Sequence, residues 1–236
     1  MQEKISISIN KNLINKIQEL KKNKNIKSKS QAFEFVLDSY FKEQKVENAI
    51  ILAGKKFDKN FILNNINILK LSGVNNFYMA AGPNINELKK TIKEKNIKYL
   101  KEDDDLCGTA GAIKLAKNDI KSSFFVIFSN IFFNFDLKKM VKFHKEKNSF
   151  ATIGLTPVEL KDSIEHIELE GNNIISFNFK KKFKSRIISA GIYLFEPQIF
   201  SYLPKKGYLE DLVFPKLAKE NKLLAYVFSK DWKYKS

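Results

Sequence analysis

The side chains that could carry out acid–base, nucleophilic or metal chemistry are few and lie far apart in the sequence. They are two histidines, His144 and His166, a single cysteine, Cys107, and a run of three carboxylates, Asp103-Asp104-Asp105. Neither histidine has a cysteine or a second histidine at metal-ligand spacing, so we expect both at the surface. No motif activates the cysteine, and an acidic loop run is usually solvated. These residues predict neither a catalytic group nor a metal site.

Three polar side chains near the N-terminus offer hydrogen bonding instead. Lys4, Ser6 and Ser8 alternate with three isoleucines, and a period of two places the polar residues on one face of a strand. A lone strand has unpaired backbone donors and acceptors, so it requires a partner. The following forty residues have a helical pattern, and a second copy of the chain is therefore the expected partner.

Two helices follow this strand. Apolar residues at helical spacing predict one helix that ends near residues 23–25, and Ser28 and Gln31 form a capping box that opens a second. Val36 and Leu37 of the second helix are expected to face inward. The order strand, helix, turn, helix over residues 1–46 resembles a ribbon-helix-helix DNA-binding domain of the Arc and Met repressor type.

This first resemblance implies a homodimer joined through an antiparallel N-terminal ribbon that enters the major groove of double-stranded DNA. Lys4, Ser6 and Ser8 would then read base edges. Ser28, Lys29 and Ser30, at the start of the second helix, would bind a DNA phosphate. The alternative is a ribbon that pairs two chains without touching DNA.

Residues 47–236 have a different pattern, in which apolar strands alternate with amphipathic helices. Strands are predicted at 49–53, 76–80, 98–100, 124–128, 151–156, 187–195 and 223–228, with a hairpin joining 164–169 to 174–179. Helices are predicted at 61–72, 85–95, 109–118 and 137–147. This succession predicts an α/β fold, a Rossmann-like mixed, mostly parallel sheet with helices on both faces.

Composition narrows the class of protein. The chain has 236 residues, 44% of them hydrophobic, and it has neither a long apolar run nor a signal-peptide pattern. We therefore expect a soluble, cytoplasmic protein with no membrane partner. The formal net charge of +16 favours an anionic partner such as nucleic acid, although a general bias towards lysine explains the excess about as well.

Five motifs in the second region carry a more specific resemblance. In chain order they span 49–54 (AIILAG), 108–112 (GTAGA), 151–158 (ATIGLTPV), 189–197 (SAGIYLFEP) and 210–218 (EDLVFPKLA). The series resembles the sugar-phosphate nucleotidyltransferases, which join a nucleoside triphosphate to a sugar 1-phosphate. The resemblance implies residual nucleotide or sugar contacts at Gly54, Gly108, Thr109, Ala110, Gly111, Ser189, Ala190 and Gly191. Close packing at strand-to-helix turns would require the same small residues.

The sequence departs from this family at four positions that serve its chemistry. The glycine-rich loop after the first strand is missing, since Gly54 is followed by Lys55 and Lys56. Asn130 stands where the family has a metal-binding aspartate, and Tyr234 stands at the second metal aspartate. The Glu-Lys-Pro motif of the sugar site becomes Phe179-Lys180-Lys181. These departures predict a catalytically inactive domain that needs no cofactor.

The leading hypothesis is therefore a sequence-specific DNA-binding transcriptional regulator. Residues 1–46 would bind DNA and dimerise, and residues 47–236 would sense a nucleotide or sugar-nucleotide effector or form a higher oligomer. One alternative is an active sugar-1-phosphate nucleotidyltransferase that uses residues 1–46 only to dimerise. Another is a structural protein that compacts DNA without sequence preference.

Overall fold

The computed structural model describes residues 6–43, 45–54, 57–94, 96–102, 107–229 and 231–235, without the side chains of 39–43, 160–165 and 179–185. Lys4, Lys55, Lys56, the 103–105 carboxylates and the side chains of residues 179–181 thus lie outside the description. The chain divides into two compact units, Met1–Lys45 and Val46–Ser236. Within the described residues, no helix is long and apolar enough to cross a membrane.

The first unit consists of helices α1 (Lys11–Asn23) and α2 (Lys29–Glu43). Asn10 caps α1 by accepting a hydrogen bond from the backbone N–H of Asn12. The predicted capping box is present, because the Ser28 hydroxyl accepts from the Gln31 N–H at 3.1 Å and the Gln31 side chain accepts from the Ser28 N–H at 3.3 Å. Both helices therefore begin where local side-chain chemistry predicts.

The apolar side chains of this unit are poorly covered in a single chain. Residues 6–10 adopt no regular structure, so the predicted ribbon is not seen in the described part of this segment. Ile17 and Ala32 are buried, but Leu13, Val36 and Leu37 are 54%, 38% and 54% exposed. The expectation that Val36 and Leu37 face inward is wrong for the isolated chain, because two helices alone provide too little surface to cover them.

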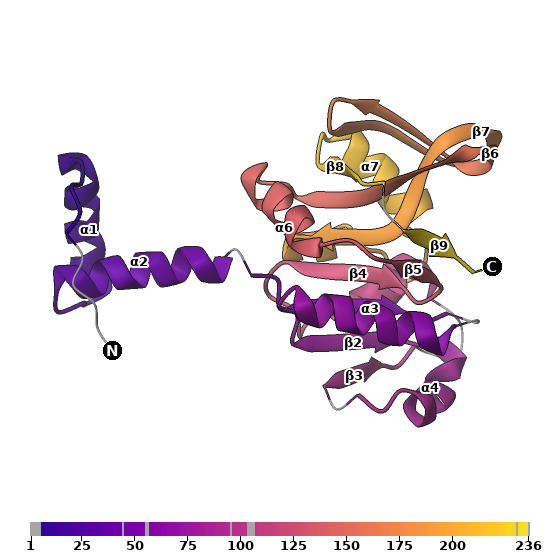
Figure 1. The fold of residues 1–236 in the computed structure, drawn as a ribbon, viewed down its shortest axis with the longest axis horizontal. Coiled ribbons are helices and arrows are strands. Elements are labelled where there is room, and N and C mark those ends of the chain that lie inside the picture. Colours follow the sequence, from indigo (N-terminus) through magenta and orange to yellow (C-terminus); the bar gives the residue numbers. More distant parts are fainter. Residues whose placement is uncertain are drawn as a thin grey trace. The chain divides into compact units, whose positions relative to one another are not determined.

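The second unit is built on a seven-stranded sheet with the strand order β3-β2-β1-β4-β7-β6-β8 (Figure 1). Strand β7 is antiparallel to its neighbours, and the other strands run in one direction. The sheet is therefore mixed and mostly parallel, as the alternation of strands and helices predicts. Its strands are β1 (Asn48–Leu52), β2 (Asn76–Ala80), β3 (Ile97–Leu100), β4 (Phe124–Phe128), β6 (Ala151–Glu170), β7 (Asn173–Phe195) and β8 (Leu223–Val227).

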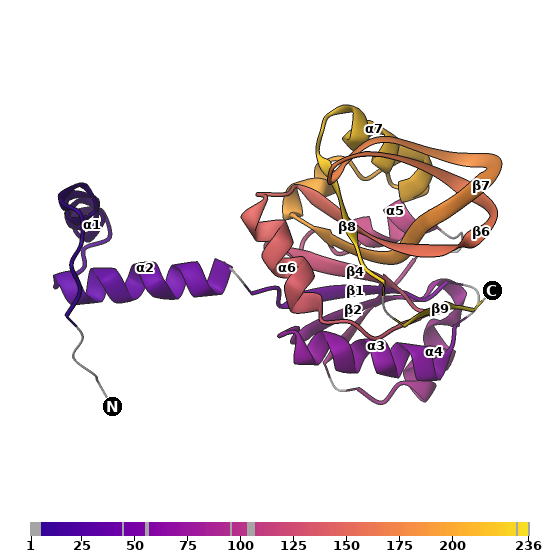
Figure 2. The ribbon, with the colours of Figure 1, turned by 45° about the horizontal axis from the view of Figure 1, so that its top comes forward.

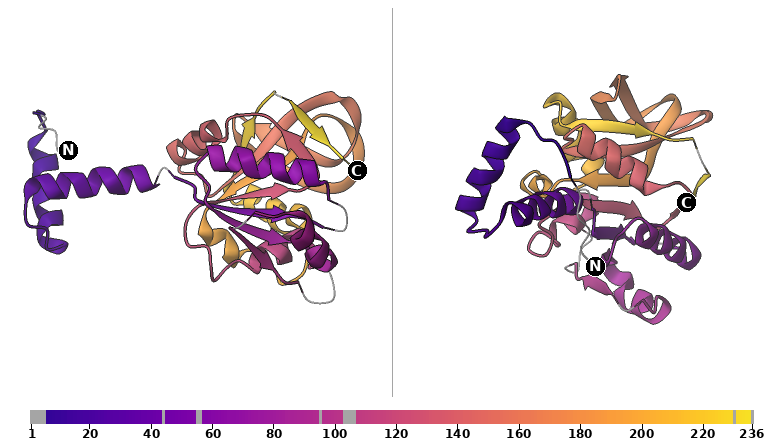
Figure 3. Two further views of the ribbon diagram at one scale, coloured as in Figure 1. Left: turned by 60° about the horizontal axis from the view of Figure 1, so that its bottom comes forward. Right: turned by 60° about the vertical axis from the view of Figure 1, so that its left-hand side comes forward.

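Helices cover both faces of this sheet (Figure 3). One hydrophobic core lies under α3 (Lys59–Leu71), α4 (Ile85–Thr91) and α6 (Leu137–Glu146). A second core lies on the opposite face, under α5 (Gly108–Lys114), α7 (Phe214–Lys219) and the short helices Pro197–Ser201 and Leu209–Val213. Because β1, β2 and β4 are buried on both faces, their sequences are continuous apolar runs.

Strands β6 and β7 are much longer than the predicted segments and form one curled hairpin (Figure 2). Near its tip the hairpin returns to the sheet, where Asn173 pairs with Leu224 of β8. The ring of Phe177 packs against that of Phe214 in α7, with ring centroids 5.2 Å apart. A further pair, β5 (Ile131–Phe133) with β9 (Trp232–Tyr234), was not predicted, because three-residue strands have no measurable periodicity.

A buried amide fixes α3 to the end of the sheet. Asn65 is fully buried, and its side-chain N–H group donates to the carbonyl oxygens of Ile131 at 3.0 Å and Phe128 at 3.4 Å. These carbonyls belong to the last residue of β4 and the first residue of β5, on either side of the turn between the two strands. The Asn65 side chain therefore ties α3 to both ends of this turn.

Removal of this amide should destabilise the second unit. We expect Asn65→Ala to lower the free energy of unfolding by about 2 kcal/mol, because it removes the buried amide that donates to both carbonyl oxygens. Urea denaturation of the purified protein measures this value. Asn60→Ala, an exposed asparagine of the same helix, is the matched control and should change it by less than about 0.5 kcal/mol. Equal effects of the two substitutions would contradict the assignment.

Candidate functional site

The carboxyl ends of β1, β2 and β4 lie side by side and form the candidate site. Leu52, the last residue of β1, pairs with Ala80 of β2 and Phe128 of β4. The chain then enters α3 on one face of the sheet, whereas the connection through α5 lies on the other face. In open α/β sheets, ligands bind outside the carboxyl ends of strands at such a switch point. Gly54 follows β1 at this point.

The turn Gly108–Gly111 begins α5 and packs against the segment 205–207. Gly108 has a φ angle of 71°, and a Cβ atom there would lie 2.4 Å from the carbonyl oxygen of Gly207. A Cβ atom on Gly111 would lie 2.4 Å from the carbonyl oxygen of Lys205. The N–H of Ala110 donates to the Gly207 carbonyl at 3.0 Å. Both glycines thus have a packing role, and contact with a ligand stays a prediction.

The Thr109 side chain connects this turn to a buried carboxyl group that sequence reasoning missed. Its hydroxyl accepts from the Leu209 N–H at 2.8 Å and donates to the Glu210 carboxyl at 3.2 Å. Glu210 is 6% exposed, and burial raises the pKa of its carboxyl group. The hydroxyl of Tyr193 lies 3.4 Å from the other carboxyl oxygen. Glu210 opens the motif 210–218, but the motif gives no sign of these distant partners.

The segment Ser189–Gly191 lies on β7 at the same edge. Ile192 pairs with Ile127 near the end of β4, so Gly191 is adjacent to the β4 carboxyl end. Gly191 has a φ angle of 70° and fits against Phe128. The Ala190 carbonyl accepts from the Trp232 indole at 2.9 Å. The structure thus brings Gly54, Gly108–Gly111 and Ser189–Gly191 to one edge of the sheet.

The residues at the family's metal positions do not fit a magnesium ion. Asn130 and Lys235 are joined by two hydrogen bonds. The side-chain amide of Asn130 donates to the backbone carbonyl of Lys235 at 3.2 Å, and the backbone N–H of Lys235 donates to the backbone carbonyl of Asn130 at 2.9 Å. The Lys235 ammonium lies 2.7 Å from Asp58, and this contact lowers the pKa of the Asp58 carboxyl. Magnesium prefers uncompensated carboxylate oxygens. The described residues also contain no cluster of three or more His, Cys, Asp or Glu side chains that could hold a metal.

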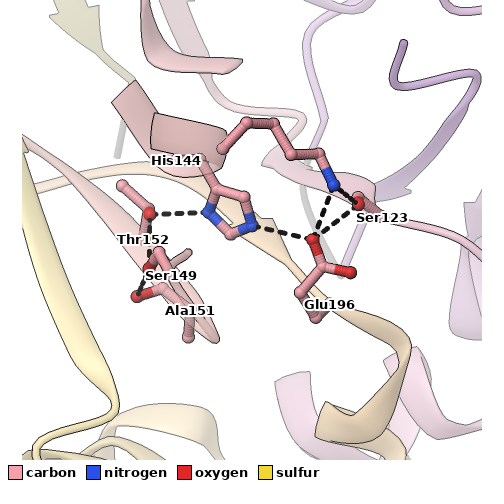
Figure 4. A network of polar contacts seen from close by, with 7 residues as sticks. Ser123, His144, Ser149, Ala151, Thr152 and Glu196 are labelled. Carbon is pink, nitrogen blue, oxygen red and sulfur yellow. Dashed lines mark hydrogen bonds and ion pairs between the residues drawn. The ribbon is translucent and has the colours of Figure 1, made fainter. Parts of the chain in front are cut away.

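The opposite, amino edge of the sheet contains a buried polar network (Figure 4). His144 is fully buried, with Nδ1 2.7 Å from the Thr152 hydroxyl and Nε2 3.2 Å from Glu196. Lys145 donates to Glu196 at 2.8 Å, and the Ser123 hydroxyl donates to it at 2.7 Å. The prediction that His144 lies at the surface is therefore wrong. His166 is 45% exposed, in keeping with its predicted surface position.

Burial and pairing shift the titration of this network in a defined way. Burial lowers the pKa of His144, despite its hydrogen bond to Glu196. Burial disfavours the charged form of Glu196, but hydrogen bonds from His144, Lys145 and Ser123 outweigh this and lower its pKa to about 2. At neutral pH the network therefore joins a neutral imidazole and an ionised carboxylate.

Comparison with known proteins identifies the family. Residues 33–233 match the nucleotidyl transferase family. The mannose-1-phosphate guanylyltransferase catalytic subunit beta of Xenopus tropicalis is 28% identical over 187 residues, which cover 74% of this chain and 52% of that protein. An Arabidopsis thaliana protein assigned as mannose-1-phosphate guanylyltransferase 3 is 31% identical over 189 residues, covering 74% and 57% respectively. The chain thus spans about half the length of these relatives.

Solved structures show the same fold. A Bacillus anthracis protein assigned as a glucose-1-phosphate thymidylyltransferase, in complex with sucrose, superposes with a TM-score of 0.68 and 19% identity, covering 80% of this chain and 89% of that chain. HddC from Yersinia pseudotuberculosis, complexed with GMP-PN, gives a TM-score of 0.65 at 20% identity, covering 80% and 93%. The chain belongs to the nucleotidyl transferase family.

These findings correct the leading sequence-based hypothesis. A DNA-binding transcriptional regulator with double-stranded DNA as partner is contradicted, because the relatives are named for sugar-phosphate nucleotidyl transfer. The prediction of an inactive domain is contradicted by the same names. Locally, Ser6 and Ser8 are exposed outside any regular element, and the Ser28 hydroxyl is used in capping α2. Lys29 and Ser30 are exposed in the first turn of that helix.

The buried network gives a test through the pH dependence of stability. Glu196 has a pKa of about 2 in the folded protein against 4.5 unfolded, so its ionisation stabilises the fold above pH 4.5, and this stabilisation is lost as the pH falls towards 2. We expect Glu196→Gln to lower the free energy of unfolding by about 2–3 kcal/mol at pH 7 and by progressively less below pH 4.5. Urea titrations across this range measure the difference.

The histidine acts in a higher pH window. The pKa of His144 is lower in the folded protein than in the unfolded chain, so unfolding takes up a proton below about pH 6.5. The free energy of unfolding therefore decreases as the pH falls below this value. We expect His144→Gln to remove the decrease that is due to this histidine. The exposed pair His166 and Glu168, 3.6 Å apart, provides matched controls, whose replacement by Gln should change stability by less than about 0.5 kcal/mol. A pH profile unchanged by His144→Gln would refute the assignment.

Proposed function

We propose that this protein is a sugar-1-phosphate nucleotidyltransferase that acts at the carboxyl edge of its sheet. The observation that carries the proposal is the convergence of Gly54, Gly108–Gly111 and Ser189–Gly191 at the switch point of a chain in this family. Relatives named as mannose-1-phosphate guanylyltransferases support GTP and mannose 1-phosphate as the first substrates to test.

The reaction joins the two substrates in one displacement. A phosphate oxygen of the sugar 1-phosphate attacks the α-phosphorus of the nucleoside triphosphate. The bond from that phosphorus to the bridging oxygen breaks, and pyrophosphate leaves with the electron pair. Catalysis of such a step consists chiefly of alignment and of stabilising the charge on the phosphoryl oxygens and the leaving group.

The described side chains suggest how the substrates would be aligned. In the proposed site, Gly108–Gly111 forms a closely packed wall for the nucleotide base, and Ser189–Gly191 forms the wall beside the sugar. Both segments are held by hydrogen bonds within the fold and thus need little reorganisation. Since the metal positions hold Asn130 and Tyr234, stabilisation of phosphate charge is assigned to side chains, and one candidate is Lys235, whose ammonium would exchange its partner Asp58 for a phosphate oxygen.

We further propose that the first unit pairs two copies of the chain. Of its described side chains, Ile17 and Ala32 are buried, whereas Leu13, Phe35 and Leu37 are exposed on different sides of their helices. A helix that is apolar on several sides requires cover on several sides. A unit of this size also buries too little surface to be stable alone. A second copy with the same exposed residues supplies that cover.

Transfer activity tests the main proposal directly. We expect purified protein to release pyrophosphate from GTP and mannose 1-phosphate in magnesium-containing buffer, measured with a coupled pyrophosphatase assay and compared with dTTP and glucose 1-phosphate. Asn130→Ala should lower kcat about tenfold or more, since it removes the amide that holds Lys235 at the edge. Asn173→Ala, at a pocket on the amino edge, is the matched control and should leave kcat unchanged. No release above a protein-free blank with any substrate pair would overturn the proposal.

Light scattering tests the pairing. We expect the unmodified protein to have twice the chain mass of 27.3 kDa in solution. The double substitution Leu13→Glu and Leu37→Glu should give the mass of a single chain, because it would place charged side chains in the interface. Lys22→Glu, at an exposed position of α1, serves as the control and should leave the dimer intact. A single-chain mass for the unmodified protein at micromolar concentration would contradict the pairing.

A further inference from the structure

The two walls of the candidate site are joined by a buried chain of side chains. Thr109, from the first wall, donates to one oxygen of Glu210 at 3.2 Å. The other oxygen lies 3.4 Å from the Tyr193 hydroxyl, which lies 3.2 Å from the hydroxyl of Ser189 in the second wall. The Gly191 N–H donates to the same Ser189 hydroxyl at 3.4 Å. A hydrogen-bonded path therefore runs between the walls through the core.

We propose that Glu210 is a positioning residue that sets the spacing of the nucleotide wall and the sugar wall through Thr109 and Tyr193. This inference rests on the proposed function for its catalytic consequence, but the geometric link is independent of it. Glu210 touches no residue assigned to the reacting phosphates, so its effect is transmitted through the two walls.

The surroundings make this link rigid. Tyr193 is 1% exposed, and its ring packs between those of Phe195, Phe214 and Phe128, with centroids 5.2 to 5.8 Å apart. Thr109 is fixed from the other side, because its hydroxyl accepts the Leu209 N–H at 2.8 Å and so directs its proton to Glu210. With both partners fixed, the carboxyl group determines the separation of the walls.

The burial of Glu210 determines which side chains could replace it. An ionised carboxylate at 6% exposure is costly, and burial raises the pKa of Glu210, with the adjacent Asp211 acting in the same direction. The amide of glutamine has the planar shape of the carboxyl group and offers one oxygen as acceptor and an NH2 group as donor. Glutamine should therefore replace it, whereas leucine, of similar size, offers neither group.

Kinetics and amide exchange test the proposal together. For Glu210→Leu we expect KM for GTP and KM for mannose 1-phosphate to rise together by about tenfold, since both walls shift, and Glu210→Gln should restore both to within about threefold of the unmodified protein. Hydrogen–deuterium exchange should show faster exchange in both 108–111 and 189–191 for Glu210→Leu, and not for Glu210→Gln. Glu196→Gln, which removes a carboxylate at the opposite edge, controls for a general loss of stability and should leave KM and both segments unchanged.

The outcomes separate the two proposals. If no turnover is detected but both segments loosen together in Glu210→Leu, the transfer activity is wrong and the link stands. If one segment loosens alone, or KM changes for one substrate alone, the link is wrong whatever the activity. Equal effects of Glu210→Leu and Glu196→Gln would likewise overturn it, because they would reflect stability alone.

Discussion

The antiparallel pairing of β7 with β4 is the interaction on which both ends of the second unit depend. It brings Ser189–Gly191 to the carboxyl edge, and it brings Glu196 to the amino edge beside Ser123. Tyr193, between these ends, points into the core and contacts Glu210. Because side chains alternate along a strand, a register shift of one residue would exchange the two faces and disconnect both networks. The register is held by Phe124, Phe125, Val126 and Ile127 of β4, which are fully buried on their two faces.

Much of this architecture follows from local sequence, and the exceptions have physical reasons. The strands at 76–80 and 124–128 and the capping box at Ser28 were predicted correctly, since apolar runs and caps are short-range signals. The surface position predicted for His144 is wrong, because the absence of a metal-ligand partner does not determine whether a side chain is buried. Leu137, Met140, Val141 and His144 follow the i, i+3, i+4, i+7 pattern of one buried face, and this signal was available.

The small residues of the two proposed walls can be read from the sequence, whereas the side chains that connect the walls cannot. Close packing at these turns requires glycine, and ligand contact there stays a prediction. Glu210 and Tyr193 were missed, since the value of a buried carboxyl depends on partners 101 and 17 residues away in the chain. The functional hypothesis failed for a related reason. Alternating lysine and serine is a common pattern, whereas the five ordered motifs of residues 49–218 are specific, and the match of residues 33–233 to the nucleotidyl transferase family agrees with these motifs.

The charge of the carboxyl edge has a consequence for how the phosphates would be held. Asn130 contributes an amide, Lys235 an ammonium, and Asp58 is already paired with that ammonium and with the first turn of α3. Because the Lys235 ammonium and the Asp58 carboxylate compensate each other, these three side chains offer no free carboxylate to a divalent cation, in contrast to an edge that carries two free aspartates. The net charge of +16 adds a long-range attraction for anions in general. In the proposed transfer, the Lys235 ammonium can act on the phosphates only if the two walls hold them at the correct distance from it. The proposed link through Glu210 would set that distance, and its importance would increase where the family's metal-binding aspartates are replaced by Asn130 and Tyr234.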